Sequence, residues 1–136
     1  MSTLFGEKHV RRYRETDGEE GHLWKEGSTI LLLTVKGRRS GREYTTPLIY
    51  NLDGATPVVV ASQGGAPDHP DWYKNLVADP DVDVQIKGDR FHARARTAEG
   101  DERERLWALM NEVWPHYAEY AQKTDREIPV VVLERL

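Results

Sequence analysis

The sequence predicts an α+β protein built on an antiparallel β-barrel with helices outside it. Two observations carry this prediction. The strand-like apolar segments follow one another as hairpins and do not alternate with helices as parallel β-α-β units do. Six such segments are present, which is enough for a closed or nearly closed barrel. With 136 residues, the chain suits a single domain spanning 1–136, because domains run to roughly 100–200 residues.

The first elements are a short helix and a buried strand. Residues 4–14 form a short amphipathic helix, with Leu4, Val10 and Tyr13 directed inward. The polar, glycine-broken TDGEEG that follows is a loop. Residues 28–35 (STILLLTV) are β-branched at both ends and lie between glycines, which favours a buried strand over a helix.

A hairpin follows the first strand. Residues 43–51 form its first arm, where the internal Pro47 indicates an edge or a bulge because proline cannot donate to a strand ladder. Leu52-Asp53-Gly54 is a tight turn, and residues 56–62 (TPVVVAS) form the second arm.

The centre of the chain holds a short helix and the clearest hairpin. Pro70, a favoured first-turn residue, introduces a helix over 71–77. Residues 81–87 and 90–97 both alternate apolar and polar side chains across the Gly88-Asp89 turn, which is typical of an antiparallel pair.

The last third begins with a helix over 101–113, where apolar residues recur at helical spacing and acids occupy the first turn. Pro115 breaks it, and residues 117–123 resume as one or two helical turns. Residues 128–133 (IPVVVL) form the closing strand.

Composition excludes several classes of function. The net charge of −4 makes nucleic acid and anionic lipid poor partners. The chain has no cysteine, so it has neither a disulfide nor a thiolate metal site, and its five histidines lack HxxxH or HExxH spacing. No signal peptide is evident, and the longest apolar run, 30–33, is far short of the ~20 residues of a membrane span. We therefore expect no metal site, and the lack of cysteine is compatible with a cytoplasmic location. The composition leaves open whether the chain is a monomer or a homodimer.

A cationic turn is the first candidate site. Residues 36–42 (KGRRSGR) place four cations, two glycines and a hydroxyl between two strands. Guanidinium groups and exposed backbone amides suit a phosphate or a carboxylate. The same residues would also be normal in a solvated hairpin turn, so the composition leaves both interpretations open.

Two further segments could shape a pocket. Residues 62–67 (SQGGAP) could present backbone amides to a flat heteroaromatic ring or a phosphate, or could serve only as a connector. Trp114, Tyr117 and Tyr120 recur every three residues, so they share one side of a helix. They could line a substrate pocket with a hydroxyl as proton donor, or form a packed face.

Three stretches carry a family resemblance. GRRSGREYTTPLIY, VVVASQGGAPDHPDWYKNLVADPDVDVQI and WPHYAEYAQKTDREIPVVVLE occur in this order over nearly the whole chain. Together they resemble the deazaflavin-dependent nitroreductases, the coenzyme F420-dependent oxidoreductases of actinobacteria. The resemblance implies a split β-barrel like that of flavin reductases and of the FMN-binding pyridoxamine-phosphate oxidases.

The resemblance also implies roles for individual residues. The cationic turn would hold the phosphate and acidic tail of F420, Thr46 and Pro47 would border its ring system, and the segment after the third strand and the following helix would add further contacts. Trp114, Tyr117 and Tyr120 would line the substrate side, and Tyr117, Tyr120 or water would donate the proton. The implied cofactor-binding residues are Lys36, Arg38, Arg39, Ser40, Gly41, Thr46, Pro47, Ala61, Ser62, Gln63, Gly64, Trp72 and Asn75.

Three positions depart from the family pattern. A basic residue is frequent where Gln63 stands, an arginine where Tyr44 stands, and a tyrosine where Trp114 stands. Lys36 or Arg42 could compensate for the missing cations, as a hypothesis.

The implied activity is hydride transfer from reduced F420 to an electron-poor acceptor such as a quinone, an enone or a nitroaromatic compound. Two alternatives stay open. The chain could bind the cofactor without turning anything over, or it could be an FMN-dependent oxidoreductase on the same barrel, with FMN the less favoured cofactor because the four cations suit a longer anionic tail.

Overall fold

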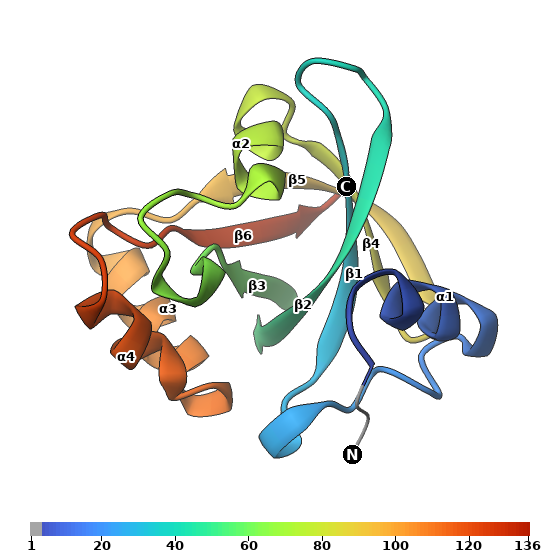
Figure 1. Cartoon of the computed structure of the whole chain (residues 1–136), viewed down its shortest axis with the longest axis horizontal. Helices are drawn as coiled ribbons and strands as arrows, with labels where there is room; N and C mark the ends of the chain where they lie inside the picture. The colour runs from blue at the N-terminus through green and yellow to red at the C-terminus, as the bar shows by residue number, and fades with distance from the viewer. Residues whose placement is uncertain (1–3) are drawn as a thin grey trace.

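The computed structural model describes residues 4–136, and its centre is a closed barrel of six antiparallel strands in the order β1-β2-β3-β6-β5-β4 (Figure 1). The antiparallel barrel expected from the hairpin pattern is thus confirmed. The strands are β1 Ile30–Lys36, β2 Glu43–Asp53, β3 Thr56–Val60, β4 Asp81–Ile86, β5 Asp89–Thr97 and β6 Val130–Arg135.

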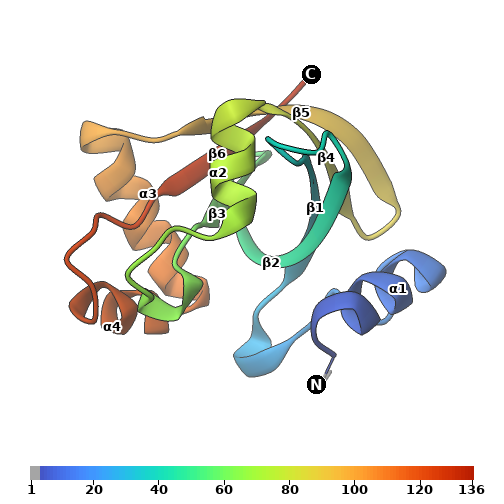
Figure 2. The same cartoon turned by 45° about the horizontal axis from the view of Figure 1, so that its top comes forward.

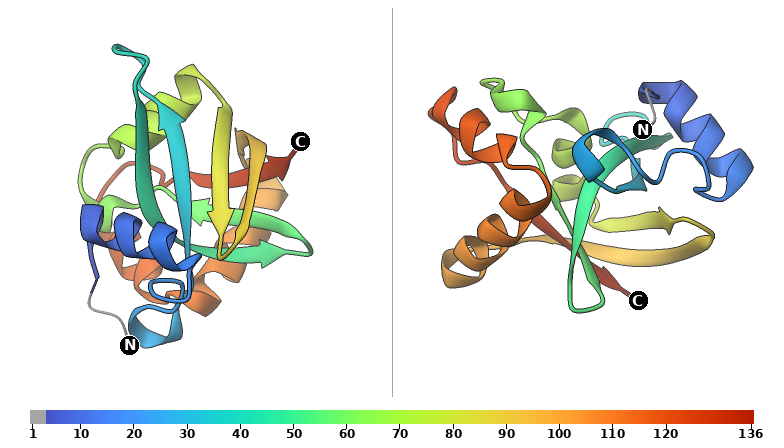
Figure 3. Two further views of the ribbon diagram at one scale, coloured as in Figure 1. Left: turned by 90° about the vertical axis from the view of Figure 1, so that its right-hand side faces the viewer. Right: turned by 90° about the horizontal axis from the view of Figure 1, so that it is seen from below.

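The helices flank this barrel on separate sides. In Figure 2, α2 crosses the front of the barrel, α1 lies to one side, and α3 and α4 lie together on the other. The right-hand view of Figure 3 shows the same separation of α1 from α3 and α4. The helices are α1 Gly6–Thr16, α2 Asp71–Ala78, α3 Gly100–Val113 and α4 His116–Gln122, with short 3-10 turns at η1 Lys25–Gly27 and η2 Gln63–Gly65.

The expected and observed boundaries differ at two instructive places. The first helix begins and ends two residues later than expected. It ends at Thr16 because Asp17 adopts the left-handed conformation and the N–H of Gly18 donates to the carbonyl of Tyr13 at 2.8 Å. Its buried residues are His9 and Tyr13, while Val10 is only half-buried. The third strand ends at Val60, earlier than expected, because the chain turns into η2.

Two apolar clusters explain the hydrophobic patterns. Inside the barrel, alternate residues such as Leu31, Leu33 and Val84 pack together, and Leu76 of α2 packs onto this cluster. The outer faces of β3 and β6 are covered by α3, and Tyr117 of α4 joins Val132 in this second cluster. These two strands are therefore buried on both faces, which is why their sequences are continuous runs of valine.

Strand β2 changes partners along its length. Its first half pairs with β1, where Pro47 lies opposite Leu32, and its pairing with β3 begins only at Tyr50, opposite Val59. Pro47 therefore stands on a stretch with a neighbour on one side only, as expected for a residue that cannot donate to a second ladder. The unpaired side of β2 at this point borders the cavity described next.

Candidate functional site

An aromatic pocket of about 420 Å³ lies between the barrel wall and the helices. Segments from five parts of the chain form it: the start of α1, the Trp24 turn, strands β1 to β3, the η2 segment leading to α2, and α4. Its lining residues are Phe5, Gly6, His9, Trp24, Ile30, Thr46, Pro47, Leu48, Ile49, Val60, Ser62, Gln63, Gly64, Pro70, Trp72, Trp114, Tyr117 and Tyr120. Rings on several walls suit a flat conjugated ligand.

A second cavity of about 490 Å³ lies between the β1–β2 turn and α2. It is polar and cationic where the first is aromatic. Thr46 and Trp72 line both cavities, so the two are adjacent and share a wall. The second is lined by Gly37, Arg38, Arg39, Ser40, Tyr44, Thr46, Asp71, Trp72 and Asn75. The arrangement suits a ligand with a flat ring at one end and anionic groups at the other.

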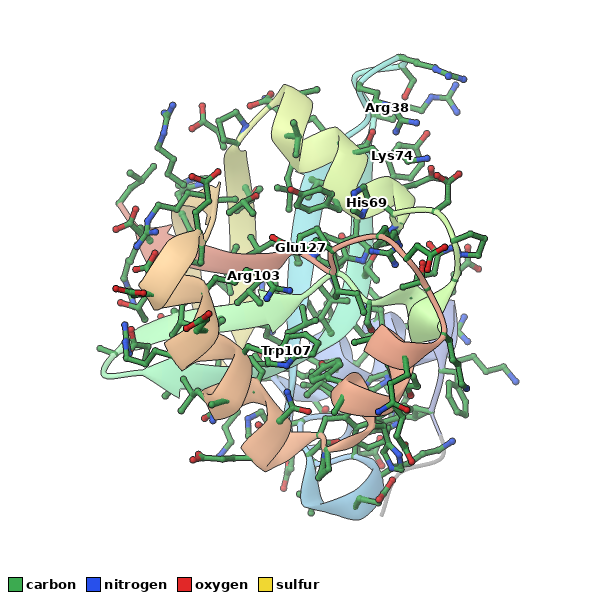
Figure 4. All side chains as sticks on the ribbon, turned by 90° about the vertical axis from the view of Figure 1, so that its left-hand side faces the viewer. Arg38, His69, Lys74, Arg103, Trp107 and Glu127 are labelled. Atoms are coloured by element: carbon green, nitrogen blue, oxygen red, sulfur yellow. The ribbon has the colours of Figure 1, made fainter. Side chains whose placement is uncertain are left out.

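Asn75 fixes the cationic turn to α2. Its carboxamide oxygen accepts a bond from the backbone N–H of Arg38 at 3.0 Å and another from Arg38 Nη1 at 2.7 Å. Arg38 Nη2 also lies 3.7 Å from Asp71. Asn75 is buried, so its role in the structure is to orient Arg38, whose position Figure 4 shows beside Lys74 of α2.

The remaining cations of the turn are unpaired. Within residues 4–136, the side chains of Lys36, Arg39 and Arg42 have no carboxylate within ion-pair distance. Tyr44 packs over the turn so closely that a Cβ on Gly37 would lie 2.7 Å from its ring. A larger residue at this position would therefore displace the Tyr44 ring. The side chains of Lys36, Arg39 and Arg42 are exposed to solvent.

The η2 segment carries two backbone N–H groups without an acceptor among residues 4–136, on residues that line the aromatic pocket. Gln63, Gly64 and Gly65 all have positive φ, at 46°, 64° and 84°. The N–H of Gly65 donates to Ser62, and that of Ala66 donates to Gln63. In the described chain the N–H groups of Gln63 and Gly64 have no such acceptor, and both residues line the pocket. Consecutive free amides in this conformation can bind an anionic or carbonyl oxygen.

Helix α4 and the residue before it supply the facing wall. The indole N–H of Trp114 donates to the hydroxyl oxygen of Tyr120 at 3.3 Å. The ring of Tyr117 meets that of Tyr120 edge to face, with centroids 6.2 Å apart. Burial raises the pKa of the Tyr117 phenol, and no residue from 4 to 136 hydrogen-bonds to its hydroxyl. The Tyr117 phenol therefore stays protonated at neutral pH and holds a proton that can be donated.

Most residues singled out from the sequence converge on the two cavities. Among the implied cofactor-binding residues, only three fall outside the linings: Lys36 is exposed at the end of β1, Gly41 is exposed in the turn, and Ala61 is fully buried. The three implied substrate-side aromatics all line the first cavity.

Sequence reasoning missed several contributors from the N-terminal part. Phe5, His9 and Trp24 line the aromatic pocket, and Trp24 lies 5.8 Å from Trp114 between ring centroids. The sequence feature that could have pointed to Trp24 as a pocket residue is its position as an aromatic side chain in a short polar connection. Arg126, which bonds to the segment carrying Ser62, was also missed, because no local pattern links it to residues some 60 positions earlier.

The chain matches the family model of F420H(2)-dependent quinone reductases over residues 6–135. It is 39% identical over 130 residues to an F420H(2)-dependent quinone reductase of Mycobacterium tuberculosis strain H37Rv, covering 93% of this chain and 87% of the relative. This chain belongs to the F420H(2)-dependent quinone reductase family.

Solved structures of family relatives show the same barrel. The F420H2-dependent reductase FDR-A is 44% identical, with a TM-score of 0.73 over 77% of this chain and 93% of that one. A structure described as a domain-swapped dimer is 40% identical, with a TM-score of 0.76 over 92% of this chain and 96% of that one. The heme storage protein HutZ of Vibrio cholerae, at 16% identity and a TM-score of 0.62 over 98% of this chain and 92% of its own, shares the fold.

Two classes of feature are absent from the part of the chain that the structure describes. No group of three or more His, Cys, Asp or Glu side chains is placed to hold a metal ion between residues 4 and 136. Over the same residues, no helix has both the length and the apolarity to cross a membrane.

Proposed function

We propose that the protein is an F420H2-dependent reductase that passes a hydride to an electron-poor acceptor of the quinone type. The observation that carries this proposal is the adjacency of a cationic cavity and an aromatic pocket, which share Thr46 and Trp72. A deazaflavin with an anionic tail has matching chemistry, a flat ring joined to a chain of negative groups. Membership of the family supports the same conclusion.

The residues present suit this cofactor. Arg38, Arg39 and Ser40 would hold its phosphate and acidic tail, while Thr46, Pro47 and Trp72 would border its ring. The free amides of Gln63 and Gly64 would bind polar atoms of the ring. Glutamine in place of a basic residue at 63 removes one cation, so the unpaired Arg39 and Arg42 would carry more of the electrostatic attraction to the tail.

Reduction of a quinone to a quinol consumes one hydride and one proton, and the reduced deazaflavin supplies the hydride when bound and is itself oxidised. The pocket would stack the acceptor between aromatic side chains, and this positioning alone can lower a barrier by several kcal/mol. Tyr120 or Tyr117 would donate a hydrogen bond and then the proton to the quinone oxygen.

The decisive experiment is a fluorescence titration of the purified protein with oxidised F420 and with FMN, followed by addition of menadione to the complex with F420H2. Tight F420 binding and menadione-dependent oxidation are expected. Binding without oxidation would favour a cofactor carrier. Preferential FMN binding, or a yellow protein on purification, would favour the FMN-dependent alternative.

Arg39→Gln tests the role of the cationic turn more cleanly than removal of Arg38, because Arg38 is bonded to Asn75 and Arg39 is not paired within residues 4–136. We expect Arg39→Gln to weaken F420 binding and to reduce its dependence on salt. Affinity for a deazaflavin lacking the phosphate and the acidic tail should not change. Equal affinity of parent and variant for F420 would refute the anchoring role.

We further propose a cytoplasmic location and a monomeric or homodimeric state, with residues 1–136 acting as one cofactor-binding domain. The absence of cysteine is compatible with a reducing compartment. Fractionation of cells and light scattering of the purified chain test these two points.

A further inference from the structure

Arg126, in the segment between α4 and β6, hydrogen-bonds to residues on both sides of η2 with all three of its guanidinium nitrogens. Its Nε donates to the carbonyl of Ala66 at 2.9 Å and its Nη2 to the carbonyl of Ser62 at 2.7 Å. Its Nη1 donates to the carbonyl of Ala61 at 3.3 Å and lies 3.0 Å from Nδ1 of His69. One side chain therefore joins four positions of a single irregular stretch.

This stretch has little regular structure to hold it. Gln63, which is not a glycine, adopts a positive φ of 46°, a conformation that costs free energy unless the surroundings impose it. The guanidinium group is a rigid planar fork with five N–H donors, so it can hold several carbonyls in a fixed arrangement. Lysine, with one ammonium, cannot reproduce this geometry.

Among the described residues, Arg126 makes no close ion pair, although the charge of Asp68 acts on it from farther away. Within residues 4–136, no carboxylate oxygen lies within 4.0 Å of its guanidinium. Burial lowers the pKa of Arg126, and both burial and the nearby Arg126 lower the pKa of His69. The partners that compensate this half-buried cation are three carbonyl oxygens and an imidazole nitrogen, and all four belong to residues 61–69.

We propose that Arg126 is a positioning residue for the cofactor ring: it binds the carbonyls of Ala61, Ser62 and Ala66 and thereby holds the N–H groups of Gln63 and Gly64 open to the aromatic pocket. This assignment rests on the proposed function. Arg126 itself is absent from the pocket lining, so it acts through the backbone and not by touching the ring.

Arg103 provides a matched control. It is also a half-buried arginine that binds the same connecting segment, donating from Nη2 to the carbonyl of Ile128 at 2.7 Å and lying 3.3 Å from Glu127. Figure 4 shows Arg103 and Glu127 near one another, with His69 farther along toward α2. Arg103 makes no hydrogen bond to residues 61–69. If the segment between α4 and β6 affected F420 binding only through overall stability, replacing either arginine would weaken binding equally.

The experiment compares Arg126→Lys with Arg103→Lys, two changes that retain the charge. Hydrogen exchange of the free protein is measured for peptides covering residues 61–69 and 127–130. Arg126→Lys should speed exchange in 61–69, and Arg103→Lys should speed it only in 127–130. The Kd for oxidised F420, from fluorescence titration, should rise about tenfold in Arg126→Lys and stay within about twofold in Arg103→Lys.

The outcomes distinguish a failure of the positioning role of Arg126 from a failure of the proposed F420-dependent function. Fast exchange in 61–69 with an unchanged Kd would overturn the assignment, and so would an equal loss of affinity in both lysine variants. A parent protein that binds no F420 would refute the proposed function instead. His69→Leu removes one of the four partners of Arg126 and leaves three, so it should fold even if Arg126→Lys does not. His69→Leu should then raise the Kd for F420 and speed exchange in residues 61–69, both less than Arg126→Lys does. If neither the Kd nor the exchange changed, the assignment would again be overturned.

Discussion

The side-chain oxygen of Asn75 accepts hydrogen bonds from both the backbone N–H and the guanidinium of Arg38. A buried amide on α2 thus fixes the direction of an arginine on a turn 37 residues earlier in the chain. The cationic turn is therefore a preorganised structure on the side facing α2, with its remaining cations free for a ligand.

The first prediction concerns Asn75→Ala. Loss of the acceptor leaves two donors of Arg38 without their partner, so the free energy of unfolding should fall by about 1–3 kcal/mol. Affinity for F420 should fall as well. Asn75→Asp retains the acceptor oxygen but adds a negative charge beside Asp71, so it should keep stability and still weaken binding of an anionic tail. Urea denaturation and F420 titration measure both quantities, and unaltered affinity in both variants would contradict the prediction.

How much of this site could be predicted depends on the range of the interaction. The hairpins and Pro47 at an edge are local patterns, and both occur in the structure as expected. The three aromatics all line the pocket, but Trp114 lies between α3 and α4 with a non-helical backbone, so only Tyr117 and Tyr120 share a helix. The cationic turn was also visible as composition, but the sequence could not tell whether its arginines were free or bonded.

Contacts between distant segments could not be predicted in the same way. Arg126 reads as a solvated charge in the polar stretch before β6, yet it binds carbonyls of the η2 segment. Trp24 lies in a polar connection and nonetheless reaches Trp114. Such pairings are set by closure of the barrel, which brings the ends of β3 and β6 together, and no periodicity in either segment encodes them.

The second prediction concerns the two phenols. The hydroxyl of Tyr120 accepts a bond from Trp114, so its own proton is free to point elsewhere, and that of Tyr117 has no partner within residues 4–136. Tyr120→Phe and Tyr117→Phe should each lower turnover more than F420 affinity, with the larger loss, on the order of 10²-fold, in the variant that removes the proton donor.

Tyr73→Phe is the control for these phenols, because the Tyr73 hydroxyl pairs with Thr97 and the residue does not line the aromatic pocket. Steady-state kinetics with menadione and F420 titrations give the two parameters. If turnover of both pocket variants equals that of Tyr73→Phe, proton transfer comes from water and the role of the phenols is wrong.

The third prediction concerns pH and His116. Hydrogen bonds to Glu119 and to Glu26 raise the pKa of His116 above its ordinary value of about 6.5. A raised pKa means that the protonated form is favoured by folding. Its contribution to stability is therefore complete below about pH 6.5 and is lost as the pH rises through the higher value in the folded protein.

This linkage has a structural consequence, because Glu26 belongs to the η1 turn next to Trp24, while His116 begins α4. The imidazolium thus joins two walls of the aromatic pocket. His116→Gln should have a lower Tm than the parent in mildly acidic buffer, and the difference should narrow as the pH is raised above neutrality. The difference in Tm should be small, because the His116 side chain is partly exposed and its glutamate partners are exposed to solvent. If the Tm difference between the parent and His116→Gln grew with pH, folding would not favour the protonated form of His116.

The fourth prediction concerns Gly65, where two walls of the pocket touch. A Cβ added there would lie 2.6 Å from the carbonyl oxygen of Tyr120 and 3.1 Å from its Cα, and the φ of 84° is already unfavourable for an L-residue. Because the clashing atoms are backbone, no side-chain rotation can relieve them. Gly65→Ala should therefore separate η2 from α4 and lower the free energy of unfolding by more than about 2 kcal/mol.

Gly54→Ala is the matched control, since Gly54 has a φ of 64° but nothing within 4 Å of an added Cβ. Gly54→Ala should lower the free energy of unfolding only by the cost of the left-handed conformation, about 1–2 kcal/mol. If the contact between η2 and α4 also sets the width of the pocket, Gly65→Ala should raise the KM for menadione, and Gly54→Ala should leave it unchanged. Equal urea midpoints for the two alanine variants would mean that α4 moves away freely, and that η2 is held by Arg126 and not by the contact with Tyr120.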